Sequence, residues 1–183
     1  MDNIKSFQSQ KVIKFLTIIF LGSILLTASA KFKIPFYPVP MTMQTFVVLF
    51  FGLAFGYKIG LSIVGLYLIE GILGLPVFSN SPERGVGLIY FTGPTMGYLI
   101  GFLFAVFLSG YLDLKKNIFI IFFKLLLSVS VIYILGLIWL GILIGWDKPI
   151  LELGAIPFLP AELLKILILT LLTKKIIKLR SFI

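Results

Sequence analysis

Long apolar segments separated by short polar ones dominate the pattern of residues along the chain. The longest stretch, residues 41–78, would reach about 60 Å as one helix at about 1.5 Å per residue, whereas the hydrocarbon core of a bilayer is about 30 Å thick. The stretch must therefore fold back, and the segment 56–60, with a glycine at each end, is the natural turn. The whole pattern predicts six spanning helices, at about residues 15–30, 42–55, 59–73, 95–111, 118–145 and 161–175.

Composition indicates that lipid is the solvent of this chain. Of its 183 residues, 60% are hydrophobic and only 13% are charged, and the mean hydropathy is +1.14. Soluble domains contain roughly 45–50% apolar and about 25% charged residues. Because each span needs about 20 apolar residues, the length leaves little room for a soluble domain. We therefore expect an all-α integral membrane protein, a bundle of six transmembrane helices that forms one membrane domain over residues 1–183.

Positive charge is distributed unevenly between the connections. The net charge of +9 would suggest a nucleic-acid partner for a soluble protein, but in a membrane protein it reflects topology, because Lys and Arg remain on the cytoplasmic side. With the N-terminus inside, most of the sixteen Lys and Arg residues lie on the inner side. This bias predicts a multi-pass protein of the cell membrane with both termini in the cytoplasm and no nucleic-acid partner. The remaining cations are Lys31, Lys33, Arg84 and Lys148 on the outer side and Lys165 within the sixth span.

The connections on the predicted outer side, residues 31–41, 76–94 and 146–160, are long and rich in proline, glycine and polar residues. Long ordered loops tend to carry binding sites, so we expect these loops to close over a pocket that is reached from outside. The first apolar run ends in Ala-Ser-Ala at residues 28–30, which is also typical of a secretory signal peptide. An uncleaved first span is favoured because everything downstream is membrane-embedded too.

The sharpest local signal is a charged pair near the start of the sixth span. Glu162 and Lys165 follow Pro160 and lie three residues apart, so they share one face of a helix. An ionisable residue within a span is a functional candidate by default. The pair offers one acceptor and one donor, which match the N–H and C=O groups of a urea or an amide. The alternative is an ion pair that extends to the membrane interface.

Other polar residues fall within or beside the spans. Glu70 could line the pocket, pair with a cation or extend to the interface. Gln44, with Thr42 and Thr45, opens the second span and could either bind a ligand or join helices by hydrogen bonds. Asn80 lies in the second outer loop and is a candidate ligand contact.

Aromatic and small residues add two further candidates. Tyr98 belongs to an outer aromatic group, most of which we expect in the interfacial belt, although one or two could stack on a flat ligand. Ser23 and Thr27, four residues apart in the first span, allow close helix approach. They serve either internal packing or docking of another membrane subunit.

Missing residue types narrow the chemistry. The chain has no cysteine and no histidine, which removes disulfides, the commonest general base and the commonest metal ligand. It also lacks the Gly-x-x-x-x-Gly-Lys-Ser/Thr phosphate loop. We therefore expect no catalysis, no metal and no cofactor, and these absences disfavour a small intramembrane enzyme that would use Glu70 or Glu162.

Four segments together resemble a known family. In chain order they are residues 38–46 (PVPMTMQTF), 71–78 (GILGLPVF), 93–98 (GPTMGY) and 157–165 (PFLPAELLK). These segments are similar to the corresponding motifs of the BioY family, the substrate-binding subunits of biotin transporters. The resemblance covers roughly residues 15–175.

The resemblance implies a six-helix S-component of the energy-coupling factor (ECF) type. Such a protein captures its vitamin from outside and works with a transmembrane coupling protein (T) and two ABC-type ATPases, which hydrolyse the ATP. Carried over to this sequence, Glu162 and Lys165 bind the ureido ring of biotin and Asn80 assists. Gln44 and Tyr98 are further ligand contacts by the same resemblance.

This sequence departs from the family pattern at two places. The family usually has Asp where this chain has Glu162, and two alanines four apart where it has Ser23 and Thr27, the coupling-subunit contact implied by the resemblance. Two alternatives to a biotin subunit remain open. One is an S-component for another vitamin, and the other is an autonomous ion-coupled carrier of a small solute.

Overall fold

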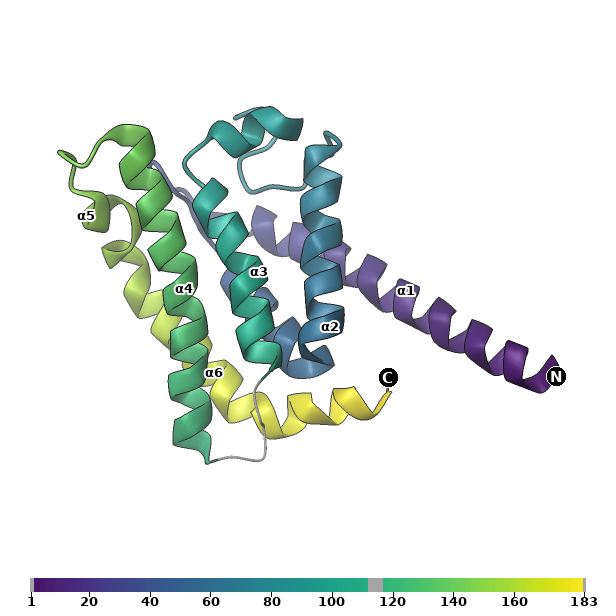
Figure 1. Cartoon of the computed structure of the whole chain (residues 1–183). Helices are drawn as coiled ribbons and strands as arrows, with labels where there is room; N and C mark the ends of the chain where they lie inside the picture. The colour runs from purple at the N-terminus through teal and green to yellow at the C-terminus, as the bar shows by residue number, and fades with distance from the viewer. Residues whose placement is uncertain (1, 112–116, 183) are drawn as a thin grey trace.

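The computed structural model of the chain describes residues 2–111 and 117–182 (Figure 1), and this part is mostly helical. Four of its helical segments are long and apolar enough to cross a membrane: 10–31, 44–72, 118–144 and 150–180. A further apolar helix, α3, is shorter. The α-helices are α1 (Asp2–Lys31), α2 (Gln44–Ile72), α3 (Met96–Gly110), α4 (Ile118–Ile144), α5 (Ile150–Gly154) and α6 (Leu159–Ile176).

Shorter elements occupy the predicted loops, and one more, η3, follows α6. An antiparallel ribbon pairs Lys33 with Thr42 and Ile34 with Met41. Its strands are β1 (Lys33–Ile34) and β2 (Met41–Thr42), and three 3-10 helices are η1 (Gly87–Thr92), η2 (Ile156–Phe158) and η3 (Ile177–Phe182).

Helix α2 turns back on itself, as the sequence predicts for the segment 56–60. Gly56 has φ 78° and ψ 172°, a backbone conformation essentially restricted to glycine. A Cβ atom placed on Gly60 would lie 3.6 Å from the backbone nitrogen of Gly52. Eight residues of a straight helix would separate these positions by about 12 Å, so residues 44–55 and 57–72 pack against each other.

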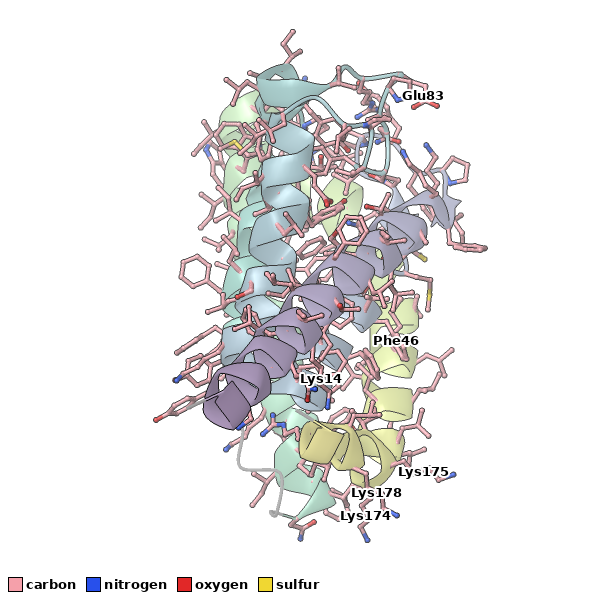
Figure 2. All side chains as sticks on the ribbon, turned by 90° about the vertical axis from the view of Figure 1, so that its right-hand side faces the viewer. Lys14, Phe46, Glu83, Lys174, Lys175 and Lys178 are labelled. Carbon is pink, nitrogen blue, oxygen red and sulfur yellow. The ribbon has the colours of Figure 1, made fainter. Side chains whose placement is uncertain are left out.

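The helices form a bundle that α1 crosses obliquely. Figures 1 and 2 show α2, α3 and α4 running side by side, α1 lying diagonally across α2, and η3 turning beneath the bundle. Close approach at glycines accounts for the tight packing: a Cβ atom on Gly101 of α3 would lie 2.7 Å from the Cα atom of Ile132 of α4. The core between these helices is apolar and includes Phe51, Ile63 and Leu125.

The two ends of the bundle differ in character. One end, which we call the loop end, carries the β1–β2 ribbon, η1, α5 and η2. At the opposite end Figure 2 shows Lys174, Lys175 and Lys178, whereas Glu83 lies at the loop end. At the end opposite the loops, Arg180 donates hydrogen bonds to the carbonyl oxygens of Leu53 (2.9 Å), Gly52 (3.1 Å) and Gly110 (3.2 Å). These carbonyls lie where helical segments end and their own hydrogen bonds run out.

Helix boundaries agree with the predicted spans except at the N-terminus. Helix α1 begins at Asp2 rather than near residue 15. Lys and Gln in its polar first half are good helix formers, so the helix continues beyond the apolar segment that predicts the span. The apolar pattern marks the part suited to lipid and carries little information on where the helix begins.

Candidate functional site

The charged pair of α6 forms the centre of the site. Glu162 Oε1 and Lys165 Nζ are 2.8 Å apart, and the two residues are only 4% and 6% exposed. Pro160 occupies the first turn of α6, where its missing N–H costs no hydrogen bond. The predicted shared helix face is therefore confirmed, and the pair lies inside the protein, not at the lipid interface.

The end of β2 and the beginning of α2 complete the environment of the pair. Lys165 Nζ donates to the carbonyl oxygen of Thr42 (2.7 Å) and to Thr45 Oγ1 (3.0 Å), in addition to Glu162. Thr45 Oγ1 in turn donates to Glu162 Oε1 at 2.9 Å. An ammonium group has three N–H donors, so every donor of Lys165 already has an acceptor within the protein.

One oxygen of the pair stays open. Glu162 Oε2 is buried and has no hydrogen-bond partner in the described part of the chain. Burying a carboxylate oxygen without a donor is costly, so this oxygen is the natural acceptor for a donor that arrives with a ligand. The hydroxyl of Tyr133 of α4 lies next to the Glu162 carboxylate, but its geometry does not make a hydrogen bond to Oε2.

A small cavity at the loop end reaches Glu162. It encloses about 50 Å³, enough for a few water molecules and much less than the roughly 300–1,000 Å³ of typical ligand pockets. A vitamin-sized solute therefore requires the walls to move. Besides Glu162, the polar side chains in these walls are Thr42 in β2, Gln44 and Thr45 in α2, Ser79 and Tyr90 in the connection after α2, Thr95 and Tyr98 at the start of α3, and Tyr133 in α4.

Gln44 and Tyr98 both line the cavity, and both side chains are held in place. Gln44 Nε2 donates to the hydroxyl of Tyr67 at 2.8 Å, and its Oε1 accepts from Thr42 at 3.3 Å. The Tyr98 hydroxyl donates to the carbonyl oxygen of Gly154 at 2.8 Å, which joins α3 to α5. The structure thus brings both predicted contacts to the cavity, together with Glu162.

Asn80 and Lys165 do not contribute to the cavity wall. Asn80 Oδ1 accepts from Lys33 Nζ at 3.2 Å, and the neighbouring Ser79 faces the cavity instead. Lys165 lines a separate apolar groove between the β1–β2 ribbon, the start of α2 and α6. In this conformation Lys165 therefore orients Glu162, and Glu162 is the member of the pair that faces the cavity.

The two residues predicted to contact a coupling subunit lie differently. Ser23 is completely buried, and its hydroxyl donates to Glu70 Oε1 of α2 at 2.8 Å. Its small side chain serves the packing of α1 on α2, and Glu70 accepts this hydrogen bond outside the cavity wall. Ser23 is thus an interior contact in this structure, whereas Thr27 is half-buried.

Sequence reasoning missed Tyr133 and Ser79. Tyr133 lies in an apolar stretch, and Ser79 lies beside the candidate Asn80, but neither hydroxyl carries a local signal that distinguishes it from a packing residue. Their role depends on α4 and the connection after α2 meeting at the cavity.

The chemistry available at this cavity is recognition of a polar solute. Glu162 is the charged residue in its wall, and the remaining polar groups are hydroxyls and one amide. Within the described ranges 2–111 and 117–182, no group of three His, Cys, Asp or Glu residues could hold a metal ion. A helical bundle with an occluded cavity and one oriented buried carboxylate defines a membrane-embedded solute-binding protein.

Comparison with known proteins identifies the family. The BioY family model matches residues 3–182, and the chain belongs to this family. A probable biotin transporter BioY of Pyrococcus horikoshii is 34% identical over 141 residues, which cover 77% of this chain and 82% of the relative. The biotin transporter BioY of Thermotoga maritima is 33% identical over 156 residues, covering 85% and 90%.

A solved structure extends the likeness to three dimensions. The crystal structure of the S-component for biotin from an ECF-type ABC transporter superposes with a TM-score of 0.76 at 26% sequence identity. The match covers 92% of this chain and 93% of that protein. These relatives are transporters and not enzymes.

Proposed function

We propose that this chain is the substrate-capture subunit (S-component) of an ECF-type ABC transporter and binds biotin from the outside of the cell. The observation that carries the proposal is the open, buried Oε2 of Glu162 in a cavity at the loop end. Membership of a family whose relatives bear the name biotin transporter supports the choice of ligand.

The ureido ring of biotin suits this site because it presents N–H donors beside a carbonyl acceptor. One ring N–H donates to Glu162 Oε2. Lys165 can donate to the ring carbonyl only by giving up Thr42 or Thr45, since all its donors are in use. Gln44 and Tyr98 provide polar walls, and Asn80 assists only after its bond with Lys33 is released.

The topology that fits this role has six spans with both termini in the cytoplasm of a multi-pass cell-membrane protein. The reversal of α2 at Gly56 supports counting α2 as two spans, and the segment 150–180 contributes the sixth through α6. Lys174, Lys175 and Lys178 at the end opposite the loops support a cytoplasmic position for that end (Figure 2). The loop end then faces outward, and residues 1–183 form one membrane domain.

The partners in this proposal are a membrane coupling protein T and two ABC-type ATPases, which hydrolyse ATP. Helix α1 is the contact surface because its outer face is apolar and exposed at Phe20, Ile24 and Leu25. Thr27 lies at the edge of that face, and Ser23 participates only if α1 separates from Glu70.

A titration tests the ligand directly. The detergent-purified chain is titrated with biotin by isothermal calorimetry, with thiamin and riboflavin as controls. We expect tight one-to-one binding of biotin alone. Binding of another vitamin would show that Glu162, one methylene longer than the Asp usual in the family, changes the ligand. A folded sample that binds none of the three refutes the proposal. Uptake in a host without ECF subunits would favour an autonomous carrier.

A further inference from the structure

Two lysines attach the connection after α2 to the end of α1. Lys31 Nζ donates to the carbonyl oxygens of Phe78 (2.8 Å) and Ser81 (2.9 Å). Lys33 Nζ donates to the carbonyl oxygen of Ser79 (2.7 Å) and to Asn80 Oδ1 (3.2 Å). We call residues 78–81 the lid turn. The carbonyls of Phe78 and Asn80 also accept hydrogen bonds from Ser81 and Arg84 within the connection. The two ammonium groups add charge-assisted hydrogen bonds that tie Phe78, Ser79 and Ser81 to the segment around the end of α1.

The lid turn is part of the cavity wall. Ser79 is 5% exposed and faces the cavity. Tyr90, also in the wall, is 3.2 Å from Ser79 Oγ through its hydroxyl and accepts from the backbone N–H of Asn80 at 3.3 Å. Movement of the lid turn would therefore displace Ser79 and Tyr90 together and open the cavity, which in its present form is too small for a vitamin.

The same short ribbon joins the lid turn to the charged pair. Lys33 in β1 lies opposite Thr42 in β2. The carbonyl oxygen of Thr42 accepts from Lys165 at 2.7 Å. Lys165 therefore contacts the strand residue that pairs with Lys33, and Lys33 in turn holds the lid turn. Helix α1 ends at Lys31, directly before this ribbon.

We propose that Lys31 and Lys33 are positioning residues for the solute site, which hold the lid turn over the cavity and set the rate of solute release. The choice of biotin as the solute rests on the proposed function. The lysines act through the lid turn and do not themselves touch the solute. A displacement of α1 draws the Lys31 ammonium away from the carbonyls of Phe78 and Ser81 and so favours opening.

A thiol-labelling experiment tests the lid without any ligand. The chain has no cysteine, so Ser79→Cys introduces a single thiol at the cavity wall. The rate of its reaction with a water-soluble maleimide is measured on the detergent-purified full chain. In the Lys31→Met/Lys33→Met background we expect labelling at least tenfold faster. Lys31→Arg/Lys33→Arg retains the donors and keeps labelling slow.

Lys148→Met is the matched control, because it removes an exposed ammonium group that pairs with Asp147. Equal labelling rates in the Met/Met and original backgrounds overturn the proposal. If the Met/Met variant fails to fold, Lys33→Met alone is measured, since it removes the bonds to Ser79 and Asn80. An unchanged rate in that folded variant overturns the proposal as well.

Release of biotin provides the second readout. In the Lys31→Met/Lys33→Met variant without the added cysteine, we expect biotin to dissociate at least tenfold faster. The dissociation rate is measured by stopped flow, with bound fluorescent biotin chased by an excess of unlabelled biotin. If the unmodified chain binds no biotin, the proposed function fails and the labelling result still decides the lid. If labelling accelerates and release does not, the lid turn does not set the release rate, and that part of the proposal is overturned.

Discussion

Replacing Lys165 by methionine tests the centre of the site most directly. The side chain keeps its approximate length and apolar stem but loses the ammonium group, and with it the hydrogen bonds to Thr42, Thr45 and Glu162. Glu162 is 4% exposed and would keep only Thr45 as a donor. A buried carboxylate that has lost its ion-pair partner is costly, and it is no longer held in place for a ligand.

The expected magnitude follows from two terms. Removing one partner of a buried ion pair costs about 3–5 kcal/mol of folding free energy when the other stays charged. Loss of a hydrogen bond to a charged group costs about 1.5–3 kcal/mol. At about 1.4 kcal/mol per tenfold change, we expect biotin affinity to fall roughly tenfold to a hundredfold, with a lower unfolding temperature.

Calorimetric titration and thermal unfolding in detergent measure the two effects. Lys124→Met is the matched control, because Lys124 is a half-buried cation within α4 that does not line the cavity. The double variant Glu162→Gln/Lys165→Met removes both charges and should recover stability but not affinity. Unchanged biotin affinity in a folded Lys165→Met sample would refute the role of the pair.

Three further predictions concern the fold and its orientation. Gly56→Ala should lower the unfolding free energy by about 1–3 kcal/mol, because only glycine adopts the backbone angles of the reversal without strain; Gly65→Ala, where a Cβ meets no atom within 4 Å, should not destabilise the protein. Arg180→Ala should cost about 1–3 kcal/mol in thermal unfolding through its lost bonds to carbonyl oxygens, with biotin affinity retained, whereas the exposed Lys175→Ala should be neutral. In intact cells an impermeant maleimide should label Lys148→Cys, and it should label Lys175→Cys only after permeabilisation; the opposite pattern would invert the proposed topology.

Much of the site was visible in the sequence because it depends on local spacing. Glu162 and Lys165 share a helix face since a helix has 3.6 residues per turn, and their charges are conspicuous in an apolar segment. Gln44 and Thr45 were candidates because they are polar residues at the start of an apolar span. Their partners were not predictable in this way: Thr45 and Glu162 are 117 residues apart in the chain, and nothing local indicates that α2 and α6 meet there.

Asn80 and Ser23 show the same difference between what local spacing predicts and what distant contacts decide. Asn80 is turned toward Lys33 rather than the cavity, and Ser23 is buried against Glu70, which is the internal packing that was one of its two interpretations. The direction of a loop side chain such as that of Asn80 is not fixed by a helical or strand period. A small side chain in a helix, such as that of Ser23, fits either an internal contact or a contact with another subunit. Each of these outcomes depends on a neighbour about 47 residues away.

The amino-acid sequence by itself determined that the chain is a membrane-embedded helical protein, where its apolar helices lie, that residues 41–78 reverse near Gly56, and that one carboxylate and one ammonium group share a helix face. Hydropathy, backbone geometry and helical periodicity act over a few turns, so they can be read locally. The tertiary structure alone decided that Glu162 rather than Lys165 faces the cavity, and that Lys31 and Lys33 hold the lid turn. Those features require contacts between distant segments, and the direction of a side chain is settled only when the segments pack.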